Sequence, residues 1–352
     1  MIWLVYRQFR ASAIVAAAVV IVFGIALATT ASGLSGLYDS SGLPSCGASC
    51  TAATTDFLAA MKADAVYPVL YFIGLGLLLL TPALIGAFWG APMITREVEG
   101  RTLRFVWHQS VTPTRWALMK ITMLGLASMA FAGLVSLALS WWAAPIDAAG
   151  GFPVGGGTQG VGTRGIGTQI SRFQKMVFDA RGVVPLGYAA LGFVVGVVLG
   201  VLVRRTVPAM AATLVVVAAV QFVVPTWVRP NLVAPATITG PVLTAPDLRS
   251  AQFGSEGQVT VPVDIRGAWI VTDRTVTPDG RAFSLLQTSQ CLNLGIAQTD
   301  DCLATLSLRQ VVTYQPADRF WEFQGIETAM LLGASVVLAA AGVVWIRKVR
   351  LS

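Results

Sequence analysis

The chain has 352 residues, of which 55% are hydrophobic and only 12% are charged, and its net charge is +7. This balance excludes an ordinary soluble domain, in which about a quarter of the residues are charged. The apolar residues form six stretches, each near the ~20 residues that a helix needs to cross a ~30 Å hydrocarbon core. The stretches are residues 12–32, 68–89, 121–143, 185–203, 207–225 and 326–346. The sequence therefore predicts an all-α polytopic membrane protein with six transmembrane helices.

The distribution of Lys and Arg predicts how the chain is threaded, because cytoplasmic loops carry an excess of these residues. With the N-terminus in the cytoplasm, the cytoplasmic segments carry 12 Lys and Arg residues against two acidic residues. These segments are residues 1–11, 90–120, 204–206 and 347–352. We expect an N-in, C-in protein whose basic side faces the anionic lipid of the inner leaflet, so no nucleic-acid partner is expected.

The first apolar stretch resembles a signal peptide, because Arg7 and Arg10 precede it. Its apolar run is nearly twice as long as the usual core of a signal peptide, so an uncleaved anchor is predicted. The loop that follows contains Cys46 and Cys50, and the last large loop contains Cys291 and Cys302. All four lie outside the cytoplasm under this threading, where disulfides form. Three pairings are open, and we favour the local one, 46–50 with 291–302.

Residues 90–120 form the one long cytoplasmic loop, so a cytoplasmic partner must dock there or on the termini. Thr102 is a candidate cap for a short helix, and Pro113 begins the approach to the third span. The alternative is a solvated basic loop, with His108 merely packed at the interface beside Trp107. The candidate residues for coupling to a partner are Glu97, Glu99, Arg101, Arg104, His108 and Arg115.

Small residues recur at spacings that let helices approach closely. They are Gly86 and Gly90 at the end of span two, and Gly192, Gly196 and Gly200 on span four. Packing within one protomer is favoured, and a seam between two protomers is the alternative. The Gly-rich run 150–167 lacks the Gly-Lys-Ser/Thr of a phosphate loop. It is expected to be a flexible linker, and the chain has no nucleotide-binding motif of its own.

Residues 226–322 predict a small β-rich extracytoplasmic insert between spans five and six. Apolar and polar residues alternate at 259–264, and further strands are expected at 268–273 and 310–314. The chain therefore divides into residues 1–225, the cap 226–322, and residues 323–352 with span six and a basic tail. Trp321, in a charged and aromatic run before span six, is a candidate interfacial anchor. A lid without a ligand site is the alternative role for the cap.

The spans contain few polar side chains. Gln221 is the only amide in spans one to five, and Glu327 is the only ionisable residue within any apolar stretch. Both are candidates for a substrate path. Ion-coupled carriers usually bury acidic or His residues near the midplane, so we expect energy to arrive from outside the bilayer. An apolar path favours hydrophobic or amphiphilic cargo, such as a drug, lipid or peptide.

The string from Arg96 to Thr102, then Ser110 to Trp116 and Lys120, resembles the first cytoplasmic loop of ABC-2-type transporter permeases. Arg101, inserted between Gly100 and Thr102, is a small departure from the pattern. Phe178 to Gly182 and Tyr314 to Gln324 are similar to strings in one bacterial branch of that family.

The resemblance implies the permease subunit of a bacterial ABC exporter, including multidrug efflux systems, in the cytoplasmic membrane. It implies two copies of a separate ATP-binding subunit, docked on the coupling helix of loop 90–120 and carrying the ATP and Mg. This chain would then bind no cofactor or metal, would not itself be an enzyme, and would pair as a homodimer or with a similar permease. The alternative is a receptor or assembly protein that displays the cap 226–322.

Overall fold

The chain forms two compact units in the computed structural model. The first contains Met1–Ala149, Lys175–Leu232 and Trp321–Ser352, and the second contains Gly150–Gln174 and Val233–Phe320. We call them the helical unit and the sheet unit. The structure describes residues 2–46, 50–99, 113–150, 152–154, 168–170, 172–249, 251–253, 257–261, 265, 267–287, 291 and 296–348.

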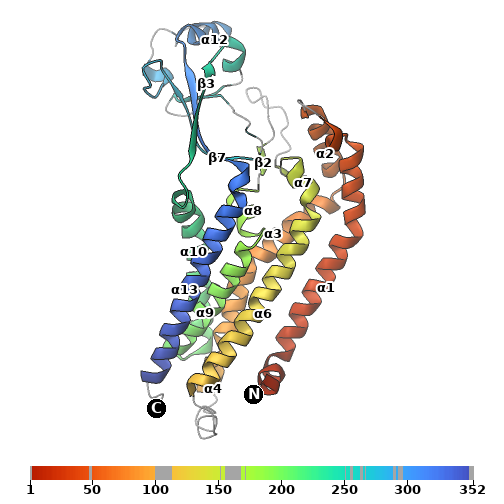
Figure 1. Cartoon of the computed structure of the whole chain (residues 1–352), viewed down its shortest axis with the longest axis vertical. Coiled ribbons are helices and arrows are strands. Elements are labelled where there is room, and N and C mark those ends of the chain that lie inside the picture. The colour runs from red at the N-terminus through yellow and green to blue at the C-terminus, as the bar shows by residue number, and fades with distance from the viewer. Residues whose placement is uncertain are drawn as a thin grey trace. The chain divides into compact units, whose positions relative to one another are not determined.

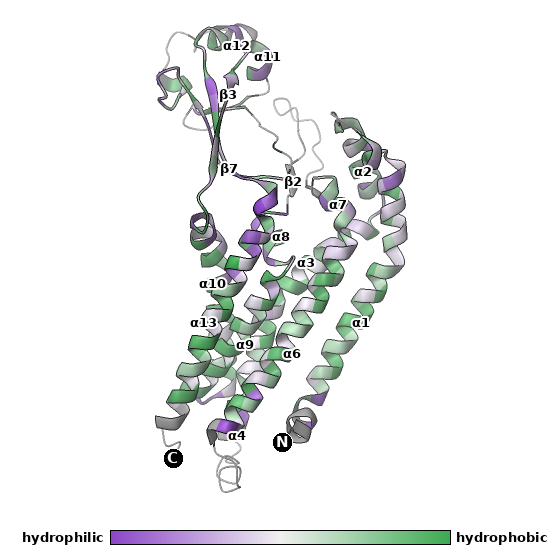
Figure 2. Ribbon diagram, viewed as in Figure 1, coloured by the Kyte–Doolittle hydropathy of each residue, from purple (hydrophilic) through white to green (hydrophobic). Residues whose placement is uncertain are grey.

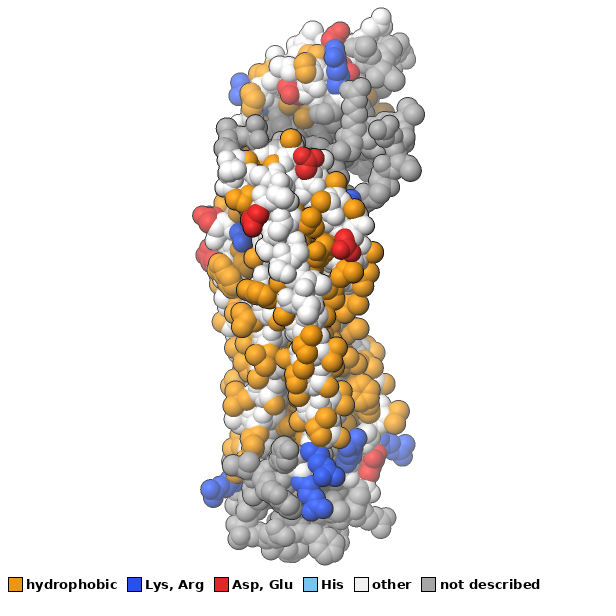
Figure 3. Space-filling view, turned by 90° about the vertical axis from the view of Figure 1, so that its right-hand side faces the viewer, with side chains coloured by type: hydrophobic (Ala, Val, Ile, Leu, Met, Phe, Trp, Pro, Cys, Tyr) orange, Lys and Arg blue, Asp and Glu red, His pale blue; other side chains and the backbone are white. Residues whose placement is uncertain are grey.

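Six helices of the helical unit are long and apolar enough to cross a membrane, as the sequence predicts. They span Phe9–Ser40, Val66–Arg96, Arg115–Trp142, Val184–Val203, Thr206–Asn231 and Ala317–Trp345. Figure 2 shows the apolar residues running along these helices and polar ones near their ends. In Figure 3 hydrophobic side chains cover the middle of the bundle, and Lys and Arg gather at the end of the bundle where α1 begins.

Several spans are built from more than one helical element (Figure 1). A π-helical turn continues α3 into α4, and another continues α10 toward residue 231, so both spans extend beyond their apolar runs. The elements are α1 (Ile2–Ser40), η1 (Leu43–Ser45), α2 (Thr51–Ala63), α3 (Val66–Ile85), η2 (Gly86–Gly90), α4 (Pro92–Glu99), α6 (Pro113–Trp142), α7 (Ala144–Ala148), α8 (Lys175–Asp179), α9 (Val184–Val203), α10 (Thr206–Val223), η3 (Val224–Val228), η4 (Arg229–Asn231) and α13 (Phe320–Lys348).

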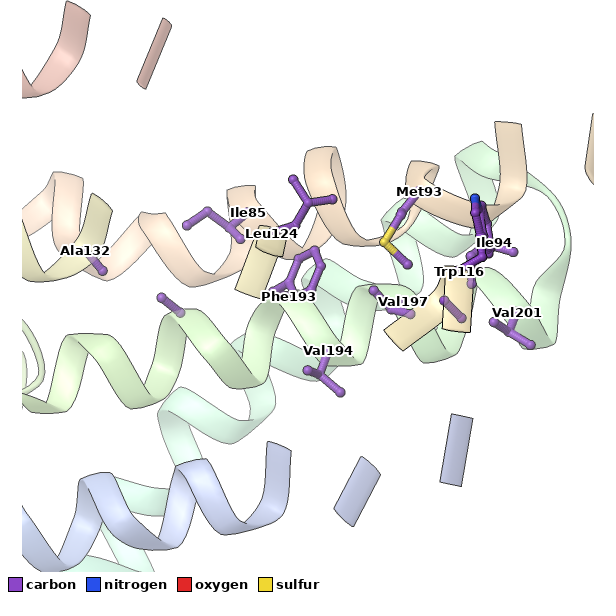
Figure 4. Packing of buried hydrophobic residues seen from close by; sticks show 12 residues of the cluster. Ile85, Met93, Ile94, Trp116, Leu124, Ala132, Phe193, Val194, Val197 and Val201 are labelled. Atoms are coloured by element: carbon purple, nitrogen blue, oxygen red, sulfur yellow. The ribbon is translucent and has the colours of Figure 1, made fainter. Parts of the chain in front are cut away.

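Helix α9 is the centre of the helical unit and packs against α3, η2, α6 and α10. It is apolar on all sides, which is typical of a helix buried among other helices. Its Phe193 and Val197 meet Ile85 and Met93 of the second span and Leu124 of α6 in one buried cluster (Figure 4). Of these elements, α3, η2 and α6 lead to and from residues 90–120.

The sheet unit contains a three-stranded antiparallel sheet of order β3-β7-β6. Its strands are β3 (Ala236–Val242), β6 (Trp269–Val276) and β7 (Arg309–Gln315), and the short pairs are β1 (Phe152–Val154) with β2 (Thr168–Ile170) and β4 (Gln252–Phe253) with β5 (Val259–Thr260). The small helices are α11 (Ala245–Leu248), η5 (Leu285–Gln287), α12 (Ile296–Thr305) and η6 (Ala317–Arg319). The antiparallel sheet confirms that the insert contains β-structure.

A small apolar core holds the sheet unit together. Leu248, Val259 and Leu303 are buried in it beside Cys291, which forms a disulfide with Cys302. The segment 172–174 also belongs to this unit. The ring of Phe173 stacks on Trp269 with centroids 6.2 Å apart, and Arg172 donates a hydrogen bond of 2.7 Å to the carbonyl of residue 317.

Candidate functional site

Glu99, at the end of α4, caps the start of a different helix. Its carboxylate accepts a hydrogen bond of 2.9 Å from the backbone N–H of Thr206, the first residue of α10. The Thr206 hydroxyl oxygen lies 2.8 Å from both the Glu99 carboxylate and the Thr95 hydroxyl. Backbone N–H groups at a helix start lack partners within their own helix, and a carboxylate satisfies them. The bonds from Thr206 hold the pKa of Glu99 below its ordinary value.

The chain turns between α9 and α10 in only two residues, Arg204 and Arg205. Arg204 has a left-handed backbone with φ of 58°, and its N–H bonds to the carbonyl of Gly200 at 3.1 Å. This conformation usually requires glycine, because a side chain there is strained. The turn is thus short, fixed and exposed, and α4 is attached directly to it.

The structure describes only some of the other predicted coupling residues. Arg101, Arg104 and His108 lie outside the described residues, as does the side chain of Glu97. Arg115 is exposed in the first turn of α6. On the same helix Lys120 is buried, and its Nζ lies 4.4 Å from the centre of the Trp116 ring.

The predicted packing glycines lie face to face between the second and fourth spans. A Cβ on Gly86 or Gly90 would come within 3.0 Å of backbone atoms of α9. A Cβ on Gly192, Gly196 or Gly200 would likewise come within 3.0 Å of backbone atoms of residues 82–91. The two backbones touch along this line, which we call the glycine seam, and no side chain fits between them.

Gln221, a candidate for the substrate path, forms a hydrogen bond to another span. Its Nε2 donates a hydrogen bond of 2.8 Å to the carbonyl of Leu79 on α3. The amide of Gln221 therefore joins the second and fifth spans in this conformation.

Glu327, the other candidate for that path, is fully buried and paired with an arginine. Both of its oxygens accept bonds from Arg229, at 2.7 Å from Nε and 2.9 Å from Nη2. Arg229 also pairs with Asp179, and the Tyr188 hydroxyl lies 3.2 Å from Glu327. The exposed fractions are 0% for Glu327, 1% for Arg229 and 6% for Asp179. These three residues, with Tyr188, form what we call the ion network.

The ion network corrects the expectation that the spans carry no charge other than Glu327. Arg229 belongs to a helix continuous with the fifth span, and Asp179 lies just before the fourth. Glu327 faces Arg229 inside the bundle. Buried charges are retained in a bilayer only when they are paired. The argument from charge-free spans against ion coupling therefore loses its basis.

Gln324 caps α9 from the sixth span, as Glu99 caps α10 from α4. Its Oε1 accepts bonds of 2.9 Å from the N–H groups of Val183 and Val184, and its Nε2 donates to the carbonyl of Phe178 at 3.1 Å. Beside it, Arg181 pairs with Asp147 at 2.5 Å. Side chains from separate spans therefore position the starts of both α9 and α10, and no sequence pattern indicated this.

The remaining predicted residues are the four cysteines and Trp321. Cys46 pairs with Cys50 and Cys291 pairs with Cys302, which is the local pairing favoured from the sequence. Trp321 is 62% exposed in the first turn of α13. No group of three or more His, Cys, Asp or Glu side chains that could hold a metal ion occurs among the described residues.

Six helices long and apolar enough to cross a membrane define the class as a multi-pass membrane protein. Residues 17–229 match the family described as ABC-2 membrane transporter related, and the chain belongs to this family. The resemblance seen in loop 90–120 is thereby confirmed. The family indicates a membrane permease of an ABC transporter, which works with an ABC ATPase subunit and is not itself a nucleotide-binding enzyme. No curated protein and no solved structure matches the chain.

Proposed function

We propose that this chain is the permease subunit of an exporter that moves hydrophobic or amphiphilic cargo outward across a bacterial cytoplasmic membrane. In this proposal both termini and loop 90–120 face the cytoplasm. The gathering of Lys and Arg at that end of the bundle supports this orientation, because such residues favour the cytoplasmic side (Figure 3). Two copies of the ATP-binding subunit dock there, and the permease works as a pair.

The observation that carries the proposal is the bond between Glu99 and Thr206. Helix α4 is the first part of loop 90–120 and ends at Glu99, so a push on the rest of the loop moves Glu99 first. Glu99 holds the N-terminus of α10, and the two-residue turn passes the same displacement to α9. The glycine seam adds a second, rigid connection between α3 and α9. Motion of an ATPase at the loop would thus reach spans two, four and five together.

The nature of the cargo is inferred from the surfaces of the spans. Large apolar side chains are exposed on α10 and α13, including Val215, Phe222 and Val337. An apolar molecule, or the apolar part of an amphiphile, can slide along such surfaces without losing hydrogen bonds to water. Drugs, lipids and apolar peptides all meet this requirement.

The test is to break the cap of α10 in the assembled complex. Glu99→Gln, with Thr206→Val as a second route to the same lesion, should lower efflux of a cationic amphiphilic dye such as ethidium by about tenfold. ATP hydrolysis by the co-expressed ATPase should continue, because its own site is intact. Glu322→Gln removes an exposed carboxylate from α13 and is the matched control.

The double variant Glu99→Gln with Thr206→Val distinguishes coupling from general damage. If the two residues act through one bond, the double variant should be no worse than either single variant. Normal efflux in a well-assembled Glu99→Gln complex would refute the coupling role. Normal complex assembly after deletion of residues 100–112 would refute docking on the loop.

A further inference from the structure

The ion network has one positive group for two carboxylates. Arg229 faces Asp179 and Glu327, and all three are nearly or completely buried. With every group ionised the network has a net charge of −1. An uncompensated charge in a poorly polarisable interior is costly, and a protein usually avoids it by binding a proton.

The hydrogen bonds distinguish the two carboxylates. Glu327 lies within bonding distance of three donors, which are Nε and Nη2 of Arg229 and the hydroxyl of Tyr188. Asp179 has a bond only to Nη2 of Arg229 among the contacts described for its carboxylate, and it shares that nitrogen with Glu327. Hydrogen bonds to a carboxylate favour its ionised form. Asp179, which has fewer donors around it, is therefore the carboxylate placed to accept a proton.

Solvent can reach Asp179 more readily than the other members. Lys175 is exposed one helical turn before it on α8 and is the one further charged group that acts on it. Burial raises the pKa of Asp179 to about 7, against the opposing effect of Arg229. The aspartate can therefore change its protonation state near neutral pH, whereas the geometry keeps the pair of Arg229 and Glu327 intact.

We propose that Asp179 is a proton-binding site of this permease. With the proton bound, the network is neutral and holds α13 against α8, α9 and η4. When the proton leaves, the buried charge becomes −1 and the attachment of α13 weakens. This inference goes beyond the proposed transport function, because it adds a proton as a ligand and makes the state of the bundle depend on pH.

The ion network lies near the points at which the chain passes between the two units, so loss of the proton from Asp179 affects several segments. The chain passes between the two units after residues 149, 174, 232 and 320. Asp147, Asp179, Arg229 and Glu327 each lie within seven residues of one of these four points. Each segment that leads to or from the sheet unit thus carries a member of an ion pair in the helical unit, and the pairs of Asp179, Arg229 and Glu327 are buried whereas Asp147 is partly exposed. A change of charge at Asp179 alters the anchoring of three segments at once.

The first test uses the unmodified full chain in detergent or membranes. A hydrophobic carbodiimide reacts with protonated, buried carboxyl groups, and mass spectrometry locates the product. We expect Asp179 to be labelled at pH 5.5 and at least fivefold less at pH 8.5, with Glu327 unlabelled at both. Labelling of Glu327 in place of Asp179, or no labelling of Asp179 at either pH, would overturn the assignment.

The second test compares thermal unfolding of the full chain with Asp179→Asn. Because folding raises the pKa of Asp179, the stabilisation from its bound proton is present at acid pH and is lost as the pH rises through about 7. The wild-type midpoint should fall by several degrees between pH 5.5 and 8.5, and that of Asp179→Asn should fall much less. Glu322→Gln should behave as wild type. An equal fall in all three proteins would overturn the proposal.

Discussion

Replacing Gly196 by alanine tests whether the glycine seam is a rigid contact. The added Cβ would lie 2.8 Å from the carbonyl carbon of Gly86, 2.9 Å from the nitrogen of Ala91, and closer still to the Gly86 carbonyl oxygen. All three are backbone atoms, which cannot rotate away as a side chain can. The two helices must therefore separate by roughly 0.5–1 Å, a gap that forfeits a quarter to a half of each contact energy along the seam.

The net cost follows from two opposing effects. Overpacking of this kind costs about 1–3 kcal/mol, and the better helix propensity of alanine returns about 1 kcal/mol. We expect Gly196→Ala to be destabilised by up to about 2 kcal/mol, measured as the unfolding midpoint in detergent. Gly125→Ala is the control, because its Cβ would meet only the ring of Phe193 at an ordinary 3.7 Å. Equal stability of the two variants would refute a backbone contact at the seam.

Two further predictions concern stability. Arg229→Gln leaves two buried carboxylates without a positive partner and should cost about 3–5 kcal/mol, measured by unfolding in detergent. Arg281→Gln, which breaks an exposed pair with Asp279, should change stability far less, because water screens exposed ion pairs, and a similar loss in both would count against the ion network. Cys291 and Cys302 should resist maleimide until a reductant is added, and reduction should destabilise the sheet unit by about 3 kcal/mol, judged by proteolysis. Labelling without reductant would contradict the bond.

The six spans and much of the glycine seam could be predicted because their signals are local. A run of about 20 apolar residues or a glycine at every fourth position is visible within one helix. Strands β6 and β7 could be predicted in the same way from their runs of β-branched and aromatic residues. Strand β3 was missed, because its sequence Ala-Thr-Ile-Thr-Gly-Pro-Val contains residues that rarely occur inside strands.

The ion network could not be predicted, because its members are far apart in the sequence. Arg229 lies 50 residues from Asp179 and 98 from Glu327. Arg229 also follows Pro225 and Trp227, which look like the end of a span, and the π-helical turn η3 continues the helix past them. Glu99 and Thr206 are 107 residues apart, and only the packing of α4 against α9 and α10 brings them together.

The sheet unit is built from two separate segments of the chain, and this limits how the unit can be gained or lost in evolution. Phe173, from the first segment, contacts Trp269 and Phe320 of the second. A single deletion of residues 233–320 would leave residues 150–174 without these partners. The unit therefore cannot be lost by one excision or acquired by one insertion without leaving a fragment exposed. Substitutions in the two segments should be correlated among homologous chains. A graft of the sheet unit onto another permease must include both segments.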